Sequence, residues 1–529
     1  MAALAATACE RNPPSKLLYH RAAAEAKTEG PCTPTAGCGK IVPETEGYRM
    51  NETTHFRVGA KELRQAVRVA KRFVPRKTSL QILTCMALEA RDGALTITAN
   101  DLVTSIRLVV PAEVMRTGTV VLPARELAKV LQGSYGGSIE IEGDDRHCAS
   151  IEATHPKGPC CTLHGLPAEE WPRAIRELGP TSADLEFSAA DLRRGLEFVA
   201  AATVPKPFDT QRDWGASILI DKSEDGLAVD FVATEGQRLH HVGLCPTVNR
   251  IEITARDRLL PADVMQEFVR LLGSDGPAKI AIGAAAGDEP DEVLLARLEY
   301  GNVVIMTRLR EGRYVNWRRV VPSSPRPNAA TVRRADLAAA LSKVEEVAAD
   351  DANKVSILPA ASHGLIQVLA RSQVLGHAGA EVLAEMEGEF GEHWGRCNRR
   401  YLADVAEHAD AEDLRIEITR GGSLDTPYAI HEPVRGMASV AVVMPCTGTD
   451  TRAELEPDGN NLDAARERAE ELRAATDRPK PKKRRSRTKE LEARIQELEA
   501  ANSSLRAEIE AMRARQDAPR PKSPDLAVA

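Results

Sequence analysis

The feature that most constrains this chain is a unit that recurs three times between residues 56 and 445. Each unit opens with a short strand that leads into a helix, at F-R-V-G-A-K-E-L from Phe56, F-S-A-A-D-L from Phe187 and V-R-R-A-D-L from Val332. Internal repeats are interpreted before local motifs, because the repeated unit sets the architecture in which each motif stands. The sequence therefore predicts three domains of one α+β fold.

A second helix start follows inside each unit, at L-P-A-R-E-L from Leu122, L-P-A-D-V-M from Leu260 and N-R-R-Y-L from Asn398. Strands with alternating apolar positions lie between and after these helices. The clearest are residues 94–99, 138–142, 217–220, 280–282, 365–369 and 414–419. The expected domains are residues 53–178, 179–325 and 326–447, each of ordinary domain size.

The two ends of the chain differ in character from the repeats. Residues 1–52 are rich in Ala, Thr, Pro, Gly and Glu without sustained periodicity, which predicts a disordered extension or a misassigned start, with Met50 as the candidate start. Residues 448–487 are expected to form a polar linker that ends in the basic run R-P-K-P-K-K-R-R-S-R. Prolines and like charges in that run disfavour a continuous helix. Residues 518–529 are expected to be a disordered tail.

A heptad pattern occupies residues 488–517. Position a holds Ile495, Asn502 and Ile509, and position d holds Leu491, Leu498, Leu505 and Met512. Ile at a with Leu at d favours a parallel two-stranded coiled coil, and one central Asn at a fixes the register. We expect this segment to pair two chains, and a single solvated helix is the alternative.

Several classes of protein are disfavoured by the sequence. No apolar run approaches the roughly 20 residues that cross a bilayer, so a cytoplasmic protein is expected. The ten cysteines are unevenly scattered and lack metal-ligand spacing, which indicates free thiols. No G-x-S-x-G, H-E-x-x-H or complete dinucleotide fingerprint occurs. We therefore expect no catalytic residues, no metal and no cofactor, and a protein that is not an enzyme.

The opening helix of the first unit, Lys61–Phe73, gives the strongest indication of a ligand. At 100° per residue its basic side chains fall within an arc of about 100°, opposite an apolar face. They are Lys61, Arg64, Arg68, Lys71 and Arg72. A solvated helix normally mixes signs, so this arc favours a polyanion or a distant acidic partner, with a solvated face as the alternative. The net charge of −7 confines any basic surface to a patch.

Further basic residues extend this pattern along the chain. They are Arg76 and Lys77 just beyond the helix, Arg125 and Lys129 one turn apart on the second helix, and the pairs Arg193-Arg194 and Arg399-Arg400 at corresponding places in the other units. Phosphate contacts need Lys or Arg but no fixed spacing. The pattern therefore predicts sequence-independent, salt-sensitive binding to a phosphate backbone.

The stretch Val232–Leu239, V-A-T-E-G-Q-R-L, ends one apolar strand in a turn and begins another. It is similar to the V-A-T-D-G-H-R-L of the bacterial replicative sliding clamp, the beta subunit of DNA polymerase III. Supporting matches are P-R-K-T-S-L-Q-I-L from Pro75, G-R-Y-V-N-W-R-R-V-V-P from Gly312, V-V-M-P from Val442 and the L-P-A-R-E-L and N-R-R-Y-L helix starts. The resemblance covers about residues 53–447 and departs from the family at Gln237, where His is usual.

This resemblance implies three clamp-type domains per chain, each of paired helices packed on antiparallel sheets. Two chains would close head to tail into a ring-forming homodimer around double-stranded DNA, with the first domain's interface strand at residues 159–163. The residues implied to approach DNA are Lys61, Arg64, Arg68, Lys71, Arg72, Lys77, Arg125, Arg193, Arg212, Trp214 and Arg399. A closed ring is retained topologically, so weak phosphate contacts suffice and sliding stays possible.

The resemblance also implies a shallow apolar groove between the second and third domains that receives short peptides from DNA polymerase, the clamp loader and repair proteins. Its residues would be Thr234, Gly236, Gln237, Arg238, Leu239, Pro261, Val264, Asn398, Tyr401, Val442, Met444 and Pro445. The alternative is that these residues only cap the joint between the two domains and bind no peptide. The residues after Pro445 leave beside this groove and would either cover it or tether two subunits.

The function implied is that of a DNA sliding clamp, a nucleoid-associated processivity factor of DNA replication. A clamp-derived interaction scaffold that does not encircle DNA is the alternative, and an enzyme of DNA metabolism is a third possibility.

Overall fold

The computed structural model describes residues 53–132, 136–155, 161–172, 177–204, 214–251, 258–286, 293–322, 326–360, 364–388, 393–417, 427–432 and 438–451. All of them belong to one structural unit, Met50–Ala529. The expected N-terminal extension, the coiled coil and the C-terminal tail lie outside the described residues.

The first repeat contains two helices among eight strands. Its elements are β1 (His55–Gly59), α1 (Ala60–Ala70), η1 (Lys71–Phe73), η2 (Gln81–Thr84), β2 (Cys85–Arg91), β3 (Ala94–Asn100), β4 (Thr104–Arg116), β5 (Gly118–Pro123), α2 (Ala124–Val130), β6 (Gly136–Gly143), β7 (Cys148–His155), β8 (Cys161–His164) and η3 (Ala168–Glu170). The predicted helix Lys61–Phe73 is thus an α-helix followed by a 3-10 turn.

The second and third repeats follow the same order with small additions. The second contains β9 (Leu178–Ser188), α3 (Ala189–Ala200), β10 (Ser217–Lys222), β11 (Val229–Thr234), β12 (Arg238–Leu244), β13 (Val248–Ile251), β14 (Leu259–Pro261), α4 (Ala262–Val269), β15 (Pro277–Ala285), β16 (Leu294–Tyr300), β17 (Val303–Arg308) and η5 (Trp317–Arg319). The third contains β18 (Ala329–Arg333), α5 (Arg334–Lys343), α6 (Glu345–Asp350), β19 (Lys354–Ala360), β20 (Leu365–Ser372), β21 (Gly376–Glu387), β22 (His393–Asn398), α7 (Arg399–His408), β23 (Asp413–Glu417), β24 (Tyr428–Glu432) and β25 (Ala438–Val443).

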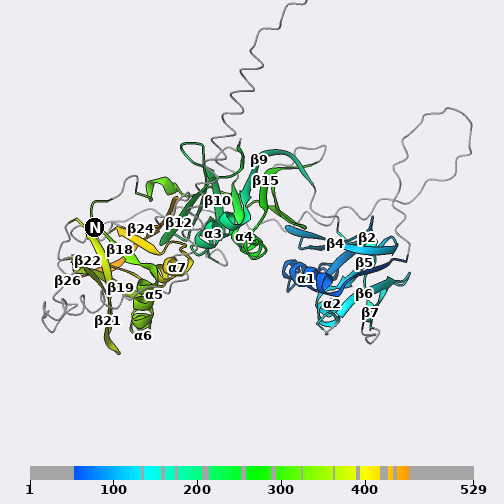
Figure 1. The fold of residues 1–529 in the computed structure, drawn as a ribbon, viewed down its shortest axis with the longest axis horizontal. Helices are drawn as coiled ribbons and strands as arrows, with labels where there is room; N and C mark the ends of the chain where they lie inside the picture. Colours follow the sequence, from blue (N-terminus) through cyan, green and yellow to red (C-terminus); the bar gives the residue numbers. More distant parts are fainter. Residues whose placement is uncertain are drawn as a thin grey trace, which may run out of the picture. The chain divides into compact units, whose positions relative to one another are not determined.

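Each repeat packs two helices against each other and onto its strands (Figure 1). The helix pairs are α1 with α2, α3 with α4 and α5 with α7. The helices form where the apolar residues recur every three to four positions. In α1 this stripe is buried at Leu63, Ala66, Val67 and Ala70, whereas Lys61 and Arg68 on the other face are exposed.

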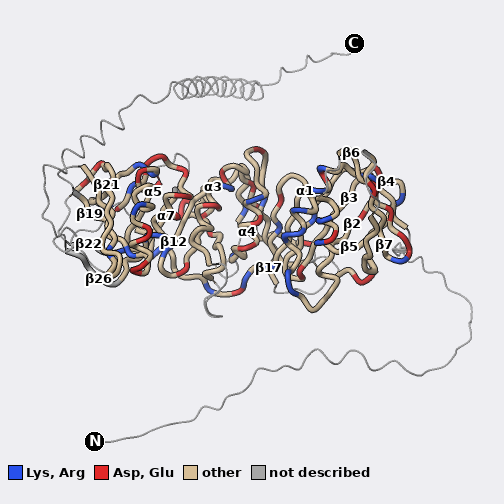
Figure 2. Tube along the Cα trace, turned by 90° about the horizontal axis from the view of Figure 1, so that it is seen from below, with Lys and Arg blue, Asp and Glu red and all other residues tan. Residues whose placement is uncertain are grey.

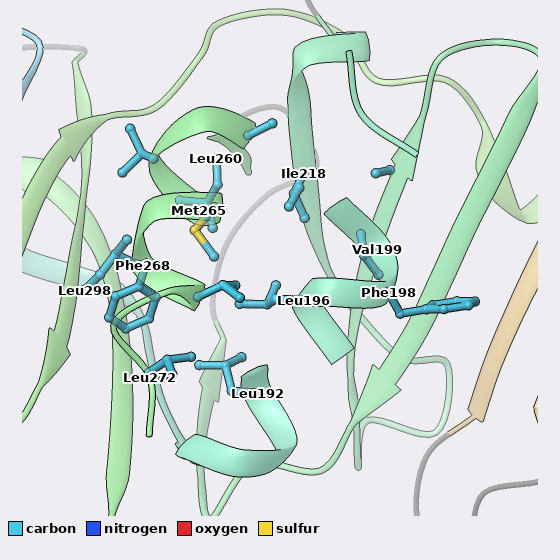
Figure 3. Packing of buried hydrophobic residues seen from close by; sticks show 14 of the residues in the cluster. Leu192, Leu196, Phe198, Val199, Ile218, Leu260, Met265, Phe268, Leu272 and Leu298 are labelled. Atoms are coloured by element: carbon cyan, nitrogen blue, oxygen red, sulfur yellow. The ribbon is translucent and has the colours of Figure 1, made fainter. Parts of the chain in front are cut away.

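The core of the second repeat shows how a helix pair is held. Leu192 and Leu196 of α3 lie beside Met265 and Phe268 of α4 (Figure 3), and all four side chains are fully buried. Burial of a Leu or Phe side chain contributes about 1.5–3 kcal/mol to folding relative to leaving it exposed. The pairing of the two helices is therefore a packing interaction and not a result of helix propensity.

The strands form two long antiparallel sheets, and each sheet passes from one repeat into the next. In the first sheet β4 of the first repeat pairs with β17 of the second, with Ile106 opposite Ile305. In the second sheet β12 pairs with β25 of the third repeat, with His240 opposite Ala441. Both junctions join the fourth strand of one repeat to the last strand of the next. The repeats are therefore related by the same strand pairing at each joint.

The chain continues past the third repeat as the strand β26 (Pro445–Thr451). It runs antiparallel to β22, with Pro445 opposite Cys397 and Thr451 opposite His393. In the first two repeats the segment after the last strand touches the equivalent edge through an isolated bridge, Val121 to Leu166 and Leu259 to Arg310. Residues 448–451, predicted to begin the polar linker, thus belong to a sheet.

Among the helices that the structure describes, none is long and apolar enough to cross a membrane. Within the same residues, no cluster of three or more His, Cys, Asp and Glu side chains is placed to hold a metal ion.

A buried histidine makes the stability of the second repeat sensitive to pH. His240 on β12 is fully buried, its ring stacks on Phe198 with centroids 4.7 Å apart, and its Nδ1 lies 2.7 Å from the Phe198 carbonyl oxygen. Burial lowers the pKa of His240 to about 3, so the folded chain keeps the ring neutral. An unfolded histidine titrates near 6.5 and binds a proton that the folded state excludes.

We expect the unfolding free energy to fall as the pH drops below about 6.5, with His240 contributing up to about 1.4 kcal/mol per pH unit. His240→Asn retains an N–H donor for Phe198 and should flatten this slope in urea unfolding between pH 7.5 and 5. His377→Asn, at an exposed position, is the matched control and should keep the wild-type slope. Identical slopes in both variants would contradict the prediction.

Candidate nucleic-acid and peptide sites

The face of α1 that points away from the core carries basic side chains that can contact a ligand. Lys61 and Arg68 are exposed and Lys71 is half-buried. Within the described residues, none of the three forms an ion pair. Because the opposite face of α1 is buried, the fold holds these cations toward solvent. This arrangement suits contacts with phosphate groups.

Two residues predicted on the same arc have structural partners. Nε of Arg64 donates to the Leu131 carbonyl oxygen at 2.8 Å, which ties α1 to the end of α2. Nη1 of Arg72 lies 3.2 Å from Oε2 of Glu267 on α4, which ties the first repeat to the second. Arg64 and Arg72 therefore already make contacts within the protein that hold helices together.

The basic residues predicted outside α1 have different environments. Lys77 is exposed, and Arg125 donates from Nη2 to the Arg76 carbonyl oxygen at 3.3 Å. Nε of Arg193 pairs with Oε1 of Glu197 one turn along α3, at 2.9 Å. Arg212 lies outside the described residues.

Arg399 differs most from the prediction. Its side chain is buried, and Nη2 lies 2.7 Å from Oε1 of Glu345. As the first residue of α7 it faces the core of the third repeat, so it joins α7 to α6 and is not presented to a ligand. A doublet of arginines in the sequence does not reveal which one points inward.

The turn at Thr234–Gln237 is built by local hydrogen bonds. The Thr234 hydroxyl donates to the Arg238 carbonyl oxygen at 2.6 Å and accepts from the Gly236 N–H at 3.1 Å. Gly236 adopts φ +97°, which only glycine takes without strain. The turn therefore places strands β11 and β12 in fixed register beside β25.

A cavity of about 740 Å³ opens beside this turn, at the joint of the second and third repeats. Of the predicted groove residues, Thr234, Gly236, Arg238, Leu239, Val442 and Met444 line it. It is also lined by Trp214, Val315, Arg318, Arg319, Val320, Val321, Pro322, Arg326 and Pro427. Apolar side chains form most of the wall, and guanidinium groups supply the polar part.

Trp214, which the resemblance implied to approach DNA, lies at the cavity. Its ring centroid is 6.4 Å from that of Tyr314. The stretch Gly312–Pro322, a family match in the sequence, supplies six residues of the cavity wall: Val315, Arg318, Arg319, Val320, Val321 and Pro322. No local pattern in this stretch marks it as a groove wall, because the wall forms only when the stretch packs against β10 and β11.

The remaining predicted groove residues lie outside the cavity lining. Pro261 and Val264 are buried in the second repeat. The Asn398 side chain caps α7 by accepting from the Arg400 N–H at 2.9 Å, and Pro445 begins β26. The Tyr401 hydroxyl donates to Oε1 of Gln237 at 2.7 Å, which bridges the third repeat to the second. Burial raises the pKa of Tyr401, so the hydroxyl stays protonated as a donor.

Arg238 is the charged centre of the joint. Its guanidinium lies 4.5 Å above the Tyr401 ring and pairs with Glu235, with Nε 3.2 Å from Oε1, and with Asp404 of α7. A buried cation with two carboxylates and an aromatic face is compensated on several sides. Arg238 therefore holds β12 to α7 while one part of it faces the cavity.

A second guanidinium fixes the opposite wall. Nη1 of Arg318 lies 2.5 Å from Asp221, Nη2 lies 3.1 Å from Asp230, and the group stacks 4.3 Å above Trp317. Burial pushes the pKa of Asp221 upward, but Arg318 and Arg258 outweigh it and hold that pKa below its ordinary value. The Val315–Pro322 wall is thus attached to strands β10 and β11 through charge.

Comparisons with known proteins agree with this arrangement. A family model described as the DNA polymerase III beta subunit, N-terminal domain, matches residues 54–175. The beta sliding clamp of Synechocystis sp. is 25% identical over 403 residues, which cover 73% of this chain and 97% of that protein. The beta sliding clamp of Chlamydia muridarum is 21% identical over 400 residues, with 74% and 98% covered.

The chain is similar to bacterial beta sliding clamps over nearly the whole length of those proteins. Solved structures of the family share its fold. A sliding clamp from Bartonella birtlesii bound to griselimycin has a TM-score of 0.63 at 20% identity, and the match covers 75% of this chain and all of that one. A sliding clamp from Bacillus subtilis gives 0.63 at 18% identity with the same coverage. The resemblance seen in the sequence is therefore confirmed.

Neighbouring arginines in the groove wall allow a matched test. Arg318→Met leaves Asp221 and Asp230 without their shared partner and should lower the unfolding free energy by about 1–3 kcal/mol. Arg319→Met changes an exposed neighbour in the same wall and should change it by less than about 0.5 kcal/mol. Urea unfolding at pH 7 measures both, and equal losses would refute the role assigned to Arg318.

Proposed function

We propose that this chain closes with a second copy into a ring around duplex DNA, where it tethers the polymerase for processive synthesis. The observation that carries the proposal is the repeated junction, β4 with β17 and β12 with β25. Each junction uses the fourth strand of one repeat and the last strand of the next. One last strand and one fourth strand take no part in these two junctions. They are β8, the last strand of the first repeat, and β21, the fourth strand of the third repeat.

Among the described residues, both of these strands have an edge to offer. β8 pairs with β7 on one side, and the first part of β21 pairs with β20 on one side. Unpaired N–H and C=O groups at a sheet edge favour addition of another strand. Antiparallel addition of β8 to the partner subunit's β21 would repeat the two internal joints, and two such contacts would close a head-to-tail dimer.

The internal joints supply the register of this contact. In the first junction Ile305 faces Ile106 and lies five residues before Arg310, the residue that bridges to Leu259. In the second junction Ala441 faces His240 and lies five residues before Cys446, the residue that pairs with Arg396. Cys161 precedes the bridging Leu166 by the same five residues.

Ile106 and His240, the residues faced in the two junctions, occupy the same position in their repeats, and Ala378 occupies that position in the third repeat. Ile106 pairs with Ala99, His240 with Ala233 and Ala378 with Ala370, each across the third and fourth strands. The junction between subunits should therefore place Cys161 opposite Ala378 of the second copy.

The helices would line the hole of such a ring. In every repeat the first helix packs on the fourth or an adjacent strand, and the continuous sheets carry this helix layer from repeat to repeat. The exposed cations of α1 would then face DNA. Retention would come from closure, so phosphate contacts need only be weak, in keeping with a clamp that acts as a processivity factor and not as a catalyst.

The cavity between the second and third repeats suits capture of partner peptides. Its wall is mostly apolar with a few guanidinium groups, which fits a short segment with apolar anchors. We infer that polymerase, the clamp loader and repair proteins bind there, at the nucleoid in the cytoplasm. The alternative, a scaffold that does not encircle DNA, would use the groove alone.

A single substitution tests the ring. Ala378→Cys should form an intersubunit disulfide with the native Cys161 under mild oxidation, because directly opposite residues of antiparallel strands have Cβ atoms about 4.5–5.5 Å apart. The protein is first loaded on nicked circular DNA with a clamp loader and ATP and then oxidised. The locked ring should stay bound through a high-salt wash and leave when the circle is linearised. Non-reducing gels and gel filtration measure the two results.

Two controls accompany this experiment. Adding Cys161→Ser to Ala378→Cys should abolish the cross-link, and Leu227→Cys at an exposed position of the second repeat should not form one. Equal loss from circular and linear DNA would favour the scaffold instead.

The C-terminal extension is proposed to strengthen the dimer. β26 leads the chain from Met444 beside the cavity to the far end of β22, about 20 Å away at 3.3 Å per residue. This course disfavours the alternative that the extension covers the groove. A coiled coil over residues 488–517 would then join two chains, and a linker of about 40 residues has a reach of about 35 Å.

Deletion of residues 488–517 should shift the subunits toward monomer at low concentration, because the tether raises their effective concentration. Light scattering over a dilution series gives the mass. Deletion of residues 518–529 is the control and should leave the mass unchanged. A dimer that dissociates identically with and without residues 488–517 would disprove the tether.

A further inference from the structure

Positive charge is concentrated on the helices of the first repeat. α1, the following turn and α2 hold seven Lys or Arg and two Glu. The helices α3 to α7 of the other two repeats hold six Lys or Arg and ten Asp or Glu. Figure 2 shows blue segments grouped at α1 and red segments at α7. The helix layer is therefore basic in one repeat and acidic in the other two.

Alignment of the repeats shows where the charge is lost. The buried residues Leu63, Leu192 and Leu337 mark one position of the first helix, and Val67, Leu196 and Leu341 mark the next turn. By this count Lys61, Arg68 and Lys71 correspond to Ala190, Glu197 and Ala200 in the second repeat and to Ala335, Ser342 and Glu345 in the third. Lys61, Arg68 and Lys71 therefore have no basic counterpart in the other repeats.

Among the described residues, three of the six cations on the other helices are paired with carboxylates. Arg193 pairs with Glu197, and Nη1 of Arg194 lies 2.6 Å from Asp410. Arg399 is buried against Glu345. These groups already have carboxylate partners, so a phosphate would have to displace them.

We propose that duplex DNA is held off-centre, against α1 and α2 of the first repeat, while the helices of the second and third repeats face it across solvent. This inference rests on the proposed ring and concerns where in the hole the DNA lies. Phosphates within about 8 Å of the acidic helices are repelled, since charges farther apart than a Debye length are screened at physiological salt. Lys61, Arg68 and Lys71 supply the attraction.

Equivalent positions on α1 and α5 allow a direct comparison. Gln65 and Ala339 occupy the same place in the first and third repeats, and both are exposed. Each is replaced separately by the photoreactive amino acid p-benzoylphenylalanine, the protein is loaded on nicked circular DNA, and cross-linking is measured after irradiation. We expect several-fold more cross-linked DNA from position 65 than from position 339.

The outcomes separate the two proposals. Retention on circular DNA with equal cross-linking at both positions overturns the off-centre placement and leaves the ring intact. Failure to be retained on circles in either variant, when the wild-type protein also fails, overturns the ring and this inference together.

Charge substitutions give an independent readout. The triple variant Lys61→Gln, Arg68→Gln and Lys71→Gln should lower the slope of log K against log salt by about 2.7, at about 0.9 per phosphate contact. Arg371→Gln, an exposed residue of β20 on the sheet, is the control and should leave the slope unchanged. The variant Ala335→Lys and Ser342→Arg restores two cations to the third repeat and should raise cross-linking from position 339. No gain there would contradict the charge argument.

Discussion

The structure depends on one kind of contact, antiparallel pairing between the fourth strand of one repeat and the last strand of the next. This pairing makes continuous sheets out of separate folding units, so it fixes the orientation of each repeat. Backbone hydrogen bonds set the antiparallel direction of the paired strands, and side chains such as Ile106 and Ile305 are buried where the strands meet. The helices, the peptide cavity and the free strand edges all take their positions from these junctions.

The cavity follows from the second junction. Leu239 and Val442 face each other across β12 and β25, and both line the cavity. Charged groups complete the joint from either side, with Arg238 held by Asp404 and Arg318 held by Asp221 and Asp230. Such paired charges add little net stability, but removal of one partner is costly. The walls of the cavity are therefore fixed in place before any peptide arrives.

The sequence predicted the features that depend on local pattern. The three repeats, the α1 helix with its buried apolar stripe and the family resemblance were all read from spacing within a few residues of each motif. Contacts between distant segments were not predictable in this way. Trp214 joins the cavity through Tyr314, and Arg399 turns inward to Glu345, because tertiary packing selects the side on which each residue points. Residues 448–451 of β26 were expected to begin the linker, because a strand that is held by backbone pairing need not show apolar alternation in its sequence.

The strand β26 also protects the third repeat from unwanted association. Without it, the outer row of amide and carbonyl groups on β22 would be an open template for another extended chain, and such edges promote aggregation. In the first two repeats the chain that runs on to the next repeat passes over this edge. The third repeat has no successor, so its own extension serves as the cover. Removal of residues 445–451 would thus uncover this edge of β22.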